Sequence, residues 1–306
     1  MAKPVVILGV FVADTSYRAA RMPRMGETIL GERFVLGPGG KASNQAVAAA
    51  RLGAETHLIT RLGNDAFAEM ALATWAEAGV TPAAIRDAES YTGAAFIFVS
   101  AETGDNAIII APGAGGRIGP ADIDAQADLI RRASVFVTQL EQPLPAAARA
   151  LLVARKAGVR TILNPAPAQA LGDDLLGLCD VLTPNETEIE ELTGIAVASD
   201  DAARRAADAL LARGVGAVVV TLGARGALYH DRERSVVAPS LSAGPVVETT
   251  GAGDAFNGGF AAELARGADP VEAVRFGCAV AGISVTRPGT APSMPTRAEV
   301  EALLAR

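Results

Sequence analysis

The sequence predicts an α/β fold in which helices cover both faces of a mainly parallel central sheet. Two observations support this prediction. Short runs of buried-type residues alternate with helical segments along most of the chain, and this order requires βαβ crossovers. The chain also has 306 residues, half of them hydrophobic and a fifth charged, which is enough to fill one large core. We therefore expect a single domain over residues 1–306.

The N-terminal third contains apolar runs of the buried type and Ala-rich stretches. The Ala-rich stretches predict helices, and the apolar runs predict strands: Ser43–Leu52 and Ala66–Ala78 are the helices, and Val5–Phe11, Phe34–Leu36 and Thr56–Thr60 are the strands. Two further apolar runs, Ala94–Ser100 and Asn106–Ala111, flank a Glu-Thr-Gly-Asp turn and predict a β-hairpin.

Both faces of this hairpin are apolar, whereas a strand pair outside the main sheet needs only one covered face. Two interpretations stay open. One face covers a ligand cleft while the other contacts a second subunit, or the two strands belong to the central sheet.

From Pro120 onward the alternation is regular. The predicted helices are Pro120–Arg132, Pro145–Ala157, Glu186–Leu192 and Asp200–Arg213, and the predicted strands are Val135–Thr138, Thr161–Leu163, Asp180–Leu182 and Ala217–Thr221. In such folds ligands bind beyond the carboxyl ends of the parallel strands, so candidate sites are expected there.

Composition excludes several classes of function. The net charge is −7 and no Lys- or Arg-rich run occurs, which argues against a nucleic-acid partner. The two cysteines and two histidines stand far apart, so neither a disulfide framework, a zinc site nor a Ser-His-Asp triad is expected. No apolar run reaches membrane-spanning length, and Val5–Val12 is interpreted as a first strand rather than a signal peptide. We expect a cytoplasmic protein with no membrane partner.

The stretch Thr249–Phe256 is the most informative motif. Gly251, Ala252 and Gly253 lead into an expected helix at Ala255–Ala265, and their backbone N–H groups and the helix dipole would hold an anion. Asp254 would repel that anion unless it removes a nearby proton, so the pairing suggests phosphoryl transfer. The alternative, equally open, is that Asp254 caps the helix.

The loop Gly37–Ala42 mimics a dinucleotide fingerprint, but Arg61 stands where the acidic ribose-binding residue is expected. It is not a P-loop, since Ala42 follows Lys41. Its glycines would permit close backbone approach, and Asn44 offers a donor and an acceptor to a polyol. A purely structural turn remains the alternative.

Two other segments follow strand ends. In Thr183–Glu188, Asn185 could cap a helix whose dipole suits Glu186 and Glu188. Alternatively, Asn185 and Glu188 lie near Mg²⁺ and phosphates through waters. In Thr221–Gly226, the glycines would let a nucleotide lie against the backbone, with Arg225 reaching phosphate. The alternative for this second segment is a hairpin turn into Ala227–His230.

Taken together, these motifs resemble PfkB-type carbohydrate kinases, closest to the ribokinase branch. The resemblance runs from Gly9 to Pro295, and its specific signatures are Gly39–Ala46 and Thr249–Asp254. Four other segments match ribokinases more narrowly: Gln139–Glu141, Asn164–Ala168, Thr183–Glu188 and Val285–Gly289. The resemblance implies a ribokinase-like three-layer αβα domain with a small β-sheet lid, about residues 15–36 and 91–111, through which two copies would form a homodimer.

The resemblance also implies an activity and its residues. ATP would phosphorylate a primary hydroxyl of a small sugar, with ribose and its O5 as the best expectation. Asp254 would be the base, and Gly251, Ala252 and Gly253 the anion hole. The sugar would contact Asp14, Gly39, Gly40, Lys41, Asn44, Glu141 and Asp254. The nucleotide would contact Asn185, Thr221, Gly223, Arg225, Gly226 and Gly253, with Glu188 near Mg²⁺. A K⁺ ion would be held around Glu248, Thr250, Val285, Gly289 and Ser293.

Three positions depart from the family pattern. Val12 replaces a sugar-side Asn, and a site built for that hydrogen bond would lose about 1–3 kcal/mol without it. Glu248 replaces an Asp, which changes the reach of the carboxylate toward K⁺. Ala42-Ser43 replaces a Gly-Ala pair, with little expected effect.

Three alternatives stay open. The first is a kinase of the same family for a nucleoside, a ketohexose or a keto-deoxy sugar acid, which Val12 favours. The second is a nicotinamide-dependent oxidoreductase that uses Gly37–Ala42, although this leaves Thr249–Asp254 unexplained. The third is a sugar-binding regulator that has lost catalysis, against which the presence of Asp254 argues.

Overall fold

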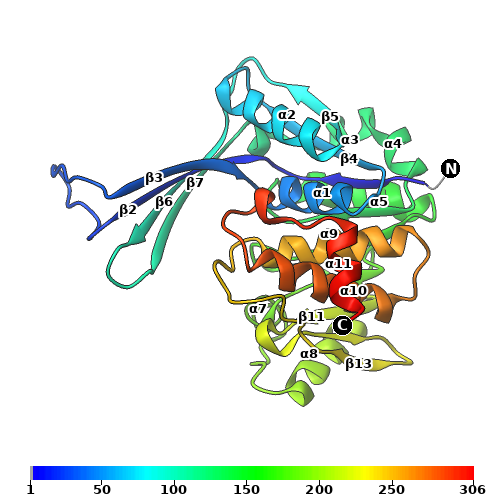
Figure 1. Cartoon of the computed structure of the whole chain (residues 1–306). Coiled ribbons are helices and arrows are strands. Elements are labelled where there is room, and N and C mark those ends of the chain that lie inside the picture. The colour runs from blue at the N-terminus through cyan, green and yellow to red at the C-terminus, as the bar shows by residue number, and fades with distance from the viewer. Residues whose placement is uncertain (1–2) are drawn as a thin grey trace.

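The computed structural model describes residues 3–306 and contains two separate β-sheets. A nine-stranded sheet forms the body, and a four-stranded sheet projects from it as an extended arm (Figure 1). The chain passes directly from the first strand of the body into the arm. The carboxyl ends of the parallel strands therefore lie on the side from which the arm departs (Figure 1).

The large sheet has the strand order β13-β12-β11-β10-β9-β8-β1-β4-β5. Its pairings from β5 to β11 are parallel, and only β12 and β13 are antiparallel, which confirms the predicted sheet type. The strands are β1 Val5–Leu8, β4 Thr56–Leu62, β5 Val80–Arg86, β8 Val135–Thr138, β9 Arg160–Leu163, β10 Val181–Leu182, β11 Ala217–Thr221, β12 Ala227–His230 and β13 Ser235–Ala238.

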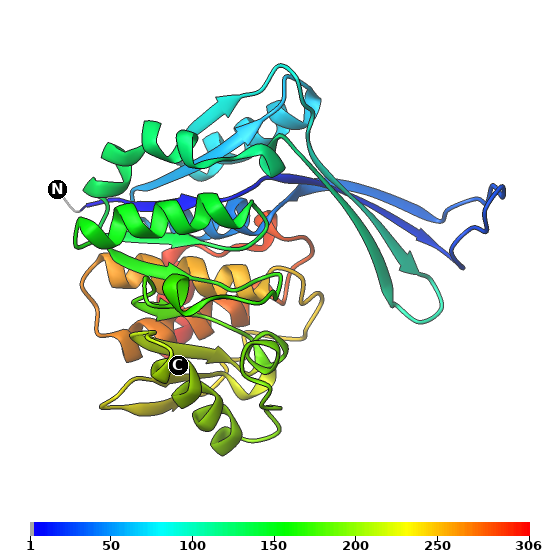
Figure 2. The same ribbon diagram turned by 180° about the vertical axis from the view of Figure 1, so that it is seen from behind.

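Helices cover both faces of this sheet (Figures 1 and 2). One face packs against α1 Lys41–Arg51, α2 Ala66–Ala78, α9 Ala252–Ala265, α10 Pro270–Ser284 and α11 Arg297–Leu304. The other face packs against α3 Pro120–Ala125, α4 Ala127–Arg132, α5 Leu144–Lys156, α6 Asp173–Leu176, α7 Glu186–Thr193 and α8 Asp200–Ala212. Successive residues of β1 point to opposite faces of the sheet. Val5 and Ile7 pack in the core on the α1 side, and Val6 and Leu8 pack in the core on the α5 side.

The four-stranded sheet, called the small sheet below, has the order β3-β2-β6-β7. It consists of β2 Val12–Ala19, β3 Arg33–Gly39, β6 Thr92–Ser100 and β7 Asn106–Gly113. The predicted hairpin is confirmed as the antiparallel pair β6–β7. Because this pair lies outside the large sheet, the interpretation that placed it in the central sheet is wrong.

Several element boundaries differ from prediction. The predicted strand Val5–Phe11 ends at Leu8, where the chain leaves the body for β2. The predicted helix Pro120–Arg132 is two helices, interrupted at Gln126. Strand β5 was not predicted because Pro82 breaks its pattern, and Pro is tolerated there because β5 is the edge of the sheet. No helix among residues 3–306 is both long and apolar enough to span a bilayer.

Helix α9 lies between α1 and α10, and its glycines set how closely they approach. A Cβ atom at Gly258 would lie 2.5 Å from the Cβ of Ala48 and 2.7 Å from the carbonyl oxygen of Gln45. A Cβ at Gly259 would lie 2.7 Å from Val280. Only glycine allows these contacts, and they bring the polar residues at the start of α1 level with Asp254.

Candidate active site

Asp254 is held by two amide side chains from α1. Asn44 Nδ2 donates to Asp254 Oδ2 at 2.9 Å, and Gln45 Nε2 donates to Oδ1 at 3.1 Å. The Asp254 side chain is only 6% exposed. The residue that caps α9 is Gly251, and no side chain caps this helix. The interpretation of Asp254 as a helix cap is therefore wrong.

The turn before Asp254 presents backbone N–H groups. Gly251 has φ 80°, a left-handed conformation that favours glycine. Within residues 3–306, the N–H groups of Gly253 and Asp254 have no protein acceptor, whereas that of Ala252 donates to Thr249 O at 3.1 Å. A Cβ atom at Gly253 would meet nothing within 4 Å. The start of α9 thus offers free donors next to open space, which suits an anion.

The predicted sugar-side residues gather near Asp254 from three segments. Asp14 lies on β2, and a Cβ at Gly39 would lie 2.2 Å from its carboxylate. Gly40 has φ 87° and packs against the backbone before β2. The backbone N–H of Lys41 donates to Glu141 Oε2 at 2.8 Å. The glycine loop therefore brings the Asp14 and Glu141 carboxyl groups to the N-terminus of α1.

Burial raises the pKa values of the two carboxyl groups in this loop region, Asp14 and Glu141. Burial, with the charges of Asp254 and Glu248, raises the pKa of Asp14 to about 6. Burial raises the pKa of Glu141 to about 7, against the opposing charge of Lys41. Such displaced carboxyl pKa values are typical of functional sites.

Asp254 and Lys41 each shift the pKa of the other. Burial raises the pKa of Asp254, while Lys41, Asn44 and Gln45 lower it. Burial alone would lower the pKa of Lys41, but the charges of Asp254, Glu141 and Glu188 raise it. Lys41 is therefore a half-buried cation near several carboxylates.

Asn185 and Glu188 form a reciprocal helix cap. The Glu188 N–H donates to Asn185 Oδ1 and the Asn185 N–H donates to Glu188 Oε2, each at 2.8 Å. The capping interpretation of this motif is confirmed. Burial and the charge of Asp254 raise the pKa of Glu188, and the charge of Glu188 in turn raises the pKa of Lys41. Among residues 3–306, no three His, Cys, Asp or Glu side chains cluster as a metal site.

The predicted nucleotide turn is the hairpin between β11 and β12, which confirms that alternative. Gly226 has φ 99°, and a Cβ there would lie 2.0 Å from Ala238 O, so the turn is tight against the chain after β13. Thr221 forms a bridge with Asn185, which places the hairpin beside α7. Arg225 pairs with Glu186 at 2.5 Å and with Asp200 at 2.8 Å. The expected phosphate contact of Arg225 would require it to leave these two carboxylates.

The residues expected around K⁺ lie in two adjoining segments. Gly289 N–H donates to Glu248 Oε2 at 2.8 Å, and Ser293 Oγ donates to Thr290 O at 2.7 Å. The carbonyl of Val285 already accepts the N–H groups of Val247 and Glu248. These two hydrogen bonds would compete with the expected K⁺ for the Val285 carbonyl oxygen.

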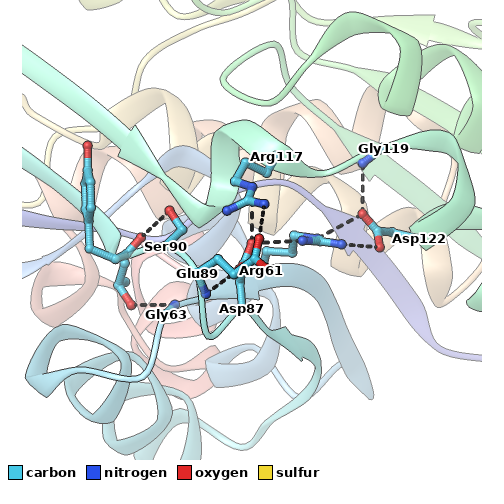
Figure 3. A network of polar contacts seen from close by, with 10 residues as sticks. Arg61, Gly63, Asp87, Glu89, Ser90, Arg117, Gly119 and Asp122 are labelled. Atoms are coloured by element: carbon cyan, nitrogen blue, oxygen red, sulfur yellow. Dashed lines mark hydrogen bonds and ion pairs between the residues drawn. The ribbon is translucent and has the colours of Figure 1, made fainter.

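Arg61, noted in the sequence for its place after a strand, is an ion-pair residue. It pairs with Asp87 and Asp122, each at 2.9 Å. Arg117 joins the network through Asp87 at 3.4 Å and Glu89 at 3.1 Å, as Figure 3 shows. These contacts connect the ends of β4 and β5 to the segment after β7, at the root of the small sheet. Arg61 thus has a structural role.

Sequence reasoning missed the amides behind Asp254. Gln45, Gln139 and Asn164 are buried and hydrogen-bonded to one another. The available signal was a pair of amide side chains, Asn44 and Gln45, inside an Ala-rich helix, where polar groups need partners.

Comparisons with known proteins identify the family of this chain. Residues 3–297 match the family described as pfkB family carbohydrate kinase. The ribokinase of Haemophilus influenzae is 39% identical over 300 residues, covering 98% of this chain and 97% of the relative. The deoxyribokinase of Salmonella typhi is 36% identical over 294 residues, covering 95% of each.

Solved structures show the same fold. The structure of Arabidopsis thaliana ribokinase complexed with ribose and ATP has a TM-score of 0.96 and 32% identity, covering both chains completely. The ribokinase of Thermotoga maritima has a TM-score of 0.90 and 34% identity, covering 99% of this chain and 100% of its own. The predicted ribokinase-like α/β fold is confirmed. The chain is an ATP-dependent sugar kinase and belongs to the pfkB family of carbohydrate kinases.

Proposed function

We propose that this sugar kinase phosphorylates the O5 hydroxyl of ribose, with Asp254 as the base. The observation that supports this most is the geometry at the start of α9. A buried carboxylate, oriented by Asn44 and Gln45, stands beside the free N–H groups of Gly253 and Asp254. A proton acceptor and an anion site thereby adjoin within the first turn of α9.

The reaction is an in-line transfer. The sugar hydroxyl gives its proton to Asp254 as its oxygen attacks the γ-phosphorus, and the bond from that phosphorus to the β,γ-bridging oxygen breaks. The free N–H groups of Gly253 and Asp254 bind the charge of the transferring group, while the Ala252 N–H is already engaged with Thr249, and Lys41 balances the charge. Asp14, Gly39, Gly40, Asn44 and Glu141 hold the sugar, and Thr221, Gly223 and Gly226 lie along the nucleotide.

Two metal ions complete the proposed site. Mg²⁺, when bound with ATP, neutralises phosphate charge, and the buried Glu188 carboxylate beside Asn185 suits it through a water. For K⁺, Glu248 presents a carboxylate next to the Gly289 loop, and Thr250, Gly289 and Ser293 offer oxygens. Hard oxygen donors of this kind fit both cations.

The small sheet is proposed to act as a lid. Residues 15–36 and 91–111 include most of its four strands and the turns between them, and Asp14 sits at its base, so movement of the sheet would carry a sugar ligand with it. Closure would exclude water and limit ATP hydrolysis.

We also propose that two copies form a homodimer through the small sheet. It exposes large apolar side chains that no element among residues 3–306 covers, at Tyr17, Phe34, Leu36, Ile108, Ile109 and Ile110. Ile109→Asp, at a side chain 65% exposed, is expected to yield monomers in analytical ultracentrifugation. Val236→Asp, on the edge strand β13, is the control and should leave the mass unchanged. A monomeric parent protein would contradict the proposal.

A second substrate, 2-deoxyribose, is favoured by one residue. Val12 is 4% exposed and has no polar side-chain atom, and it lies on the same strand face as Asp14, two residues away. A deoxyribokinase is also among the relatives. A sugar that lacks a hydroxyl would leave nothing unpaired against this side chain.

Val12→Asn is therefore expected to favour ribose. The ratio of kcat/KM for ribose to that for 2-deoxyribose should rise about 10-fold, since one hydrogen bond discriminates by about 1–3 kcal/mol. Val10→Asn, at a buried neighbour in the same core, is the matched control and should leave the ratio unchanged. An unchanged ratio in Val12→Asn would show that position 12 does not face the sugar.

The substrate itself is tested by coupled ADP detection with and without K⁺. The panel contains ribose, 2-deoxyribose, ketohexoses, keto-deoxy sugar acids and nucleosides. Turnover with ribose that K⁺ stimulates is the expected result. A nucleoside or ketohexose as the best substrate would move the protein to another branch of the family.

A further inference from the structure

We propose that Gln45 is a positioning residue for Asp254 and that Gln139 holds the Gln45 side chain in the required orientation. The inference rests on the proposed role of Asp254 as the base. It concerns two glutamines that touch neither the sugar nor the nucleotide in that proposal. They act on the reaction only through the orientation of the Asp254 carboxylate.

The contacts form a directed chain. Gln139 Nε2 donates to Gln45 Oε1 at 2.5 Å, and Gln45 Nε2 donates to Asp254 Oδ1 at 3.1 Å. Gln45 Nε2 also donates to Asn164 Oδ1 at 3.2 Å. Gln45 and Gln139 are fully buried, so these bonds are shielded from competition with solvent.

The direction of each amide is fixed by the carboxylate. Ionised Asp254 only accepts hydrogen bonds, so the NH₂ group of Gln45 must face it. The carbonyl of Gln45 then faces Gln139, whose own NH₂ group must point back. Gly9 leaves room for the Gln139 carbonyl, since a Cβ there would lie 2.5 Å from Gln139 Oε1. Two aligned amide dipoles therefore point their positive ends at Asp254.

A second branch of the hydrogen-bond network runs from Asn164 back to α9, the helix that contains Asp254. Asn164 Nδ2 donates to Thr183 O at 3.0 Å, and Thr183 Oγ1 bonds to Asn257 Oδ1 at 2.6 Å. Asn257 Nδ2 donates to the carbonyl of Gly253 at 2.8 Å. The base and the anion-binding turn are thus held by one buried network from the ends of β9 and β10.

This arrangement serves the proton transfer in two ways. Gln45 on Oδ1 and Asn44 on Oδ2 fix the plane of the carboxylate, which leaves its remaining lone pairs aimed at the acceptor hydroxyl. Both bonds also favour the ionised form, against the burial of Asp254 in the protein. Loss of the Gln45 bond should therefore both misplace the base and keep it protonated to higher pH.

The test compares single variants of the full-length protein. Gln45→Met and Gln139→Met should lower kcat about 10- to 100-fold, the cost of a misplaced catalytic group, with KM for ATP nearly unchanged. The acid limb of the kcat–pH profile should move to higher pH in Gln45→Met. It should move further in Gln45→Glu, which places a second carboxyl beside Asp254. The double variant Gln45→Met/Gln139→Met should match Gln45→Met, because Gln139 acts through Gln45.

Gln142→Met is the matched control. Gln142 is a buried neighbour that donates to Thr138 Oγ1 and Gln139 O and makes no contact with Gln45. It should lower Tm about as much as Gln139→Met and leave the pH profile unmoved. If Gln45→Met keeps the parent pH profile while Asp254→Asn is inactive, the positioning role is overturned and the base survives. If Asp254→Asn retains turnover, the proposed function itself fails.

Discussion

Replacing Asp254 with Asn is expected to lower kcat at least a hundredfold while leaving ATP binding nearly intact. Removal of a general base typically costs about 10²–10⁴ in rate, and Asn has the same shape but cannot accept the proton. KM and kcat from coupled ADP detection, with ATP affinity from calorimetry, provide the measurement.

The same substitution should not weaken the fold. Burial raises the pKa of Asp254 in the folded protein, so the ionised side chain opposes folding, and this cost grows as pH rises above the pKa of the unfolded carboxyl. Asn removes the charge, and Tm should stay level or increase. Asp180→Asn, at the amino end of β10, is the control and should keep parent turnover. Near-normal kcat in Asp254→Asn would remove this residue from catalysis.

Replacing Gly253 with Ala is expected to separate activity from stability. The added methyl group meets no protein atom within 4 Å, and alanine is favoured over glycine inside helices by about 0.5–1 kcal/mol. It would nevertheless fill the space that a phosphate needs to approach the N–H groups. Alanine keeps its N–H group, but the phosphate could no longer reach it, and loss of one such donor contact costs about 10²–10³ in kcat. We therefore expect kcat/KM for ATP to fall at least tenfold. Tm should stay level or rise.

Alanine substitutions at two other glycines are the controls for Gly253→Ala. Gly119→Ala, where a Cβ also meets nothing within 4 Å, should leave turnover unchanged. Gly251→Ala forces alanine into a left-handed conformation and should lower both Tm and activity. Parent-like kcat/KM in Gly253→Ala would place the phosphate elsewhere.

The fold was largely predictable because its signals are local. Runs such as Val135–Thr138 and Ala217–Thr221 are buried on both faces, and their predicted bounds match the observed strands. Strand β2 was missed because its alternation is weak and its residues grow exposed toward the tip of the small sheet. A strand of that kind is defined by its partners, β3 and β6, rather than by its own pattern.

The candidate site likewise contains residues with a local signal in the sequence and residues without one. Asp254 stood out because glycines and a carboxylate are adjacent in sequence, and the proposed proton transfer beside an anion site was inferred from that spacing. Gln45 gave no such signal, since its partner lies 209 positions away and meets it only when two helices pack. Arg225 was expected at phosphate, but Glu186 and Asp200, 39 and 25 positions away, pair with it in the fold.

The contact at Gly258 changes how inactivating substitutions in this protein should be interpreted. Position 258 lies within the contact between α1 and α9, and any larger residue there would push α1 away from α9 and stretch the bonds from Asn44 and Gln45 to Asp254. A kinase-dead variant isolated from a mutagenesis screen could thus arise from added volume in the interior, with every residue of the reaction centre unaltered.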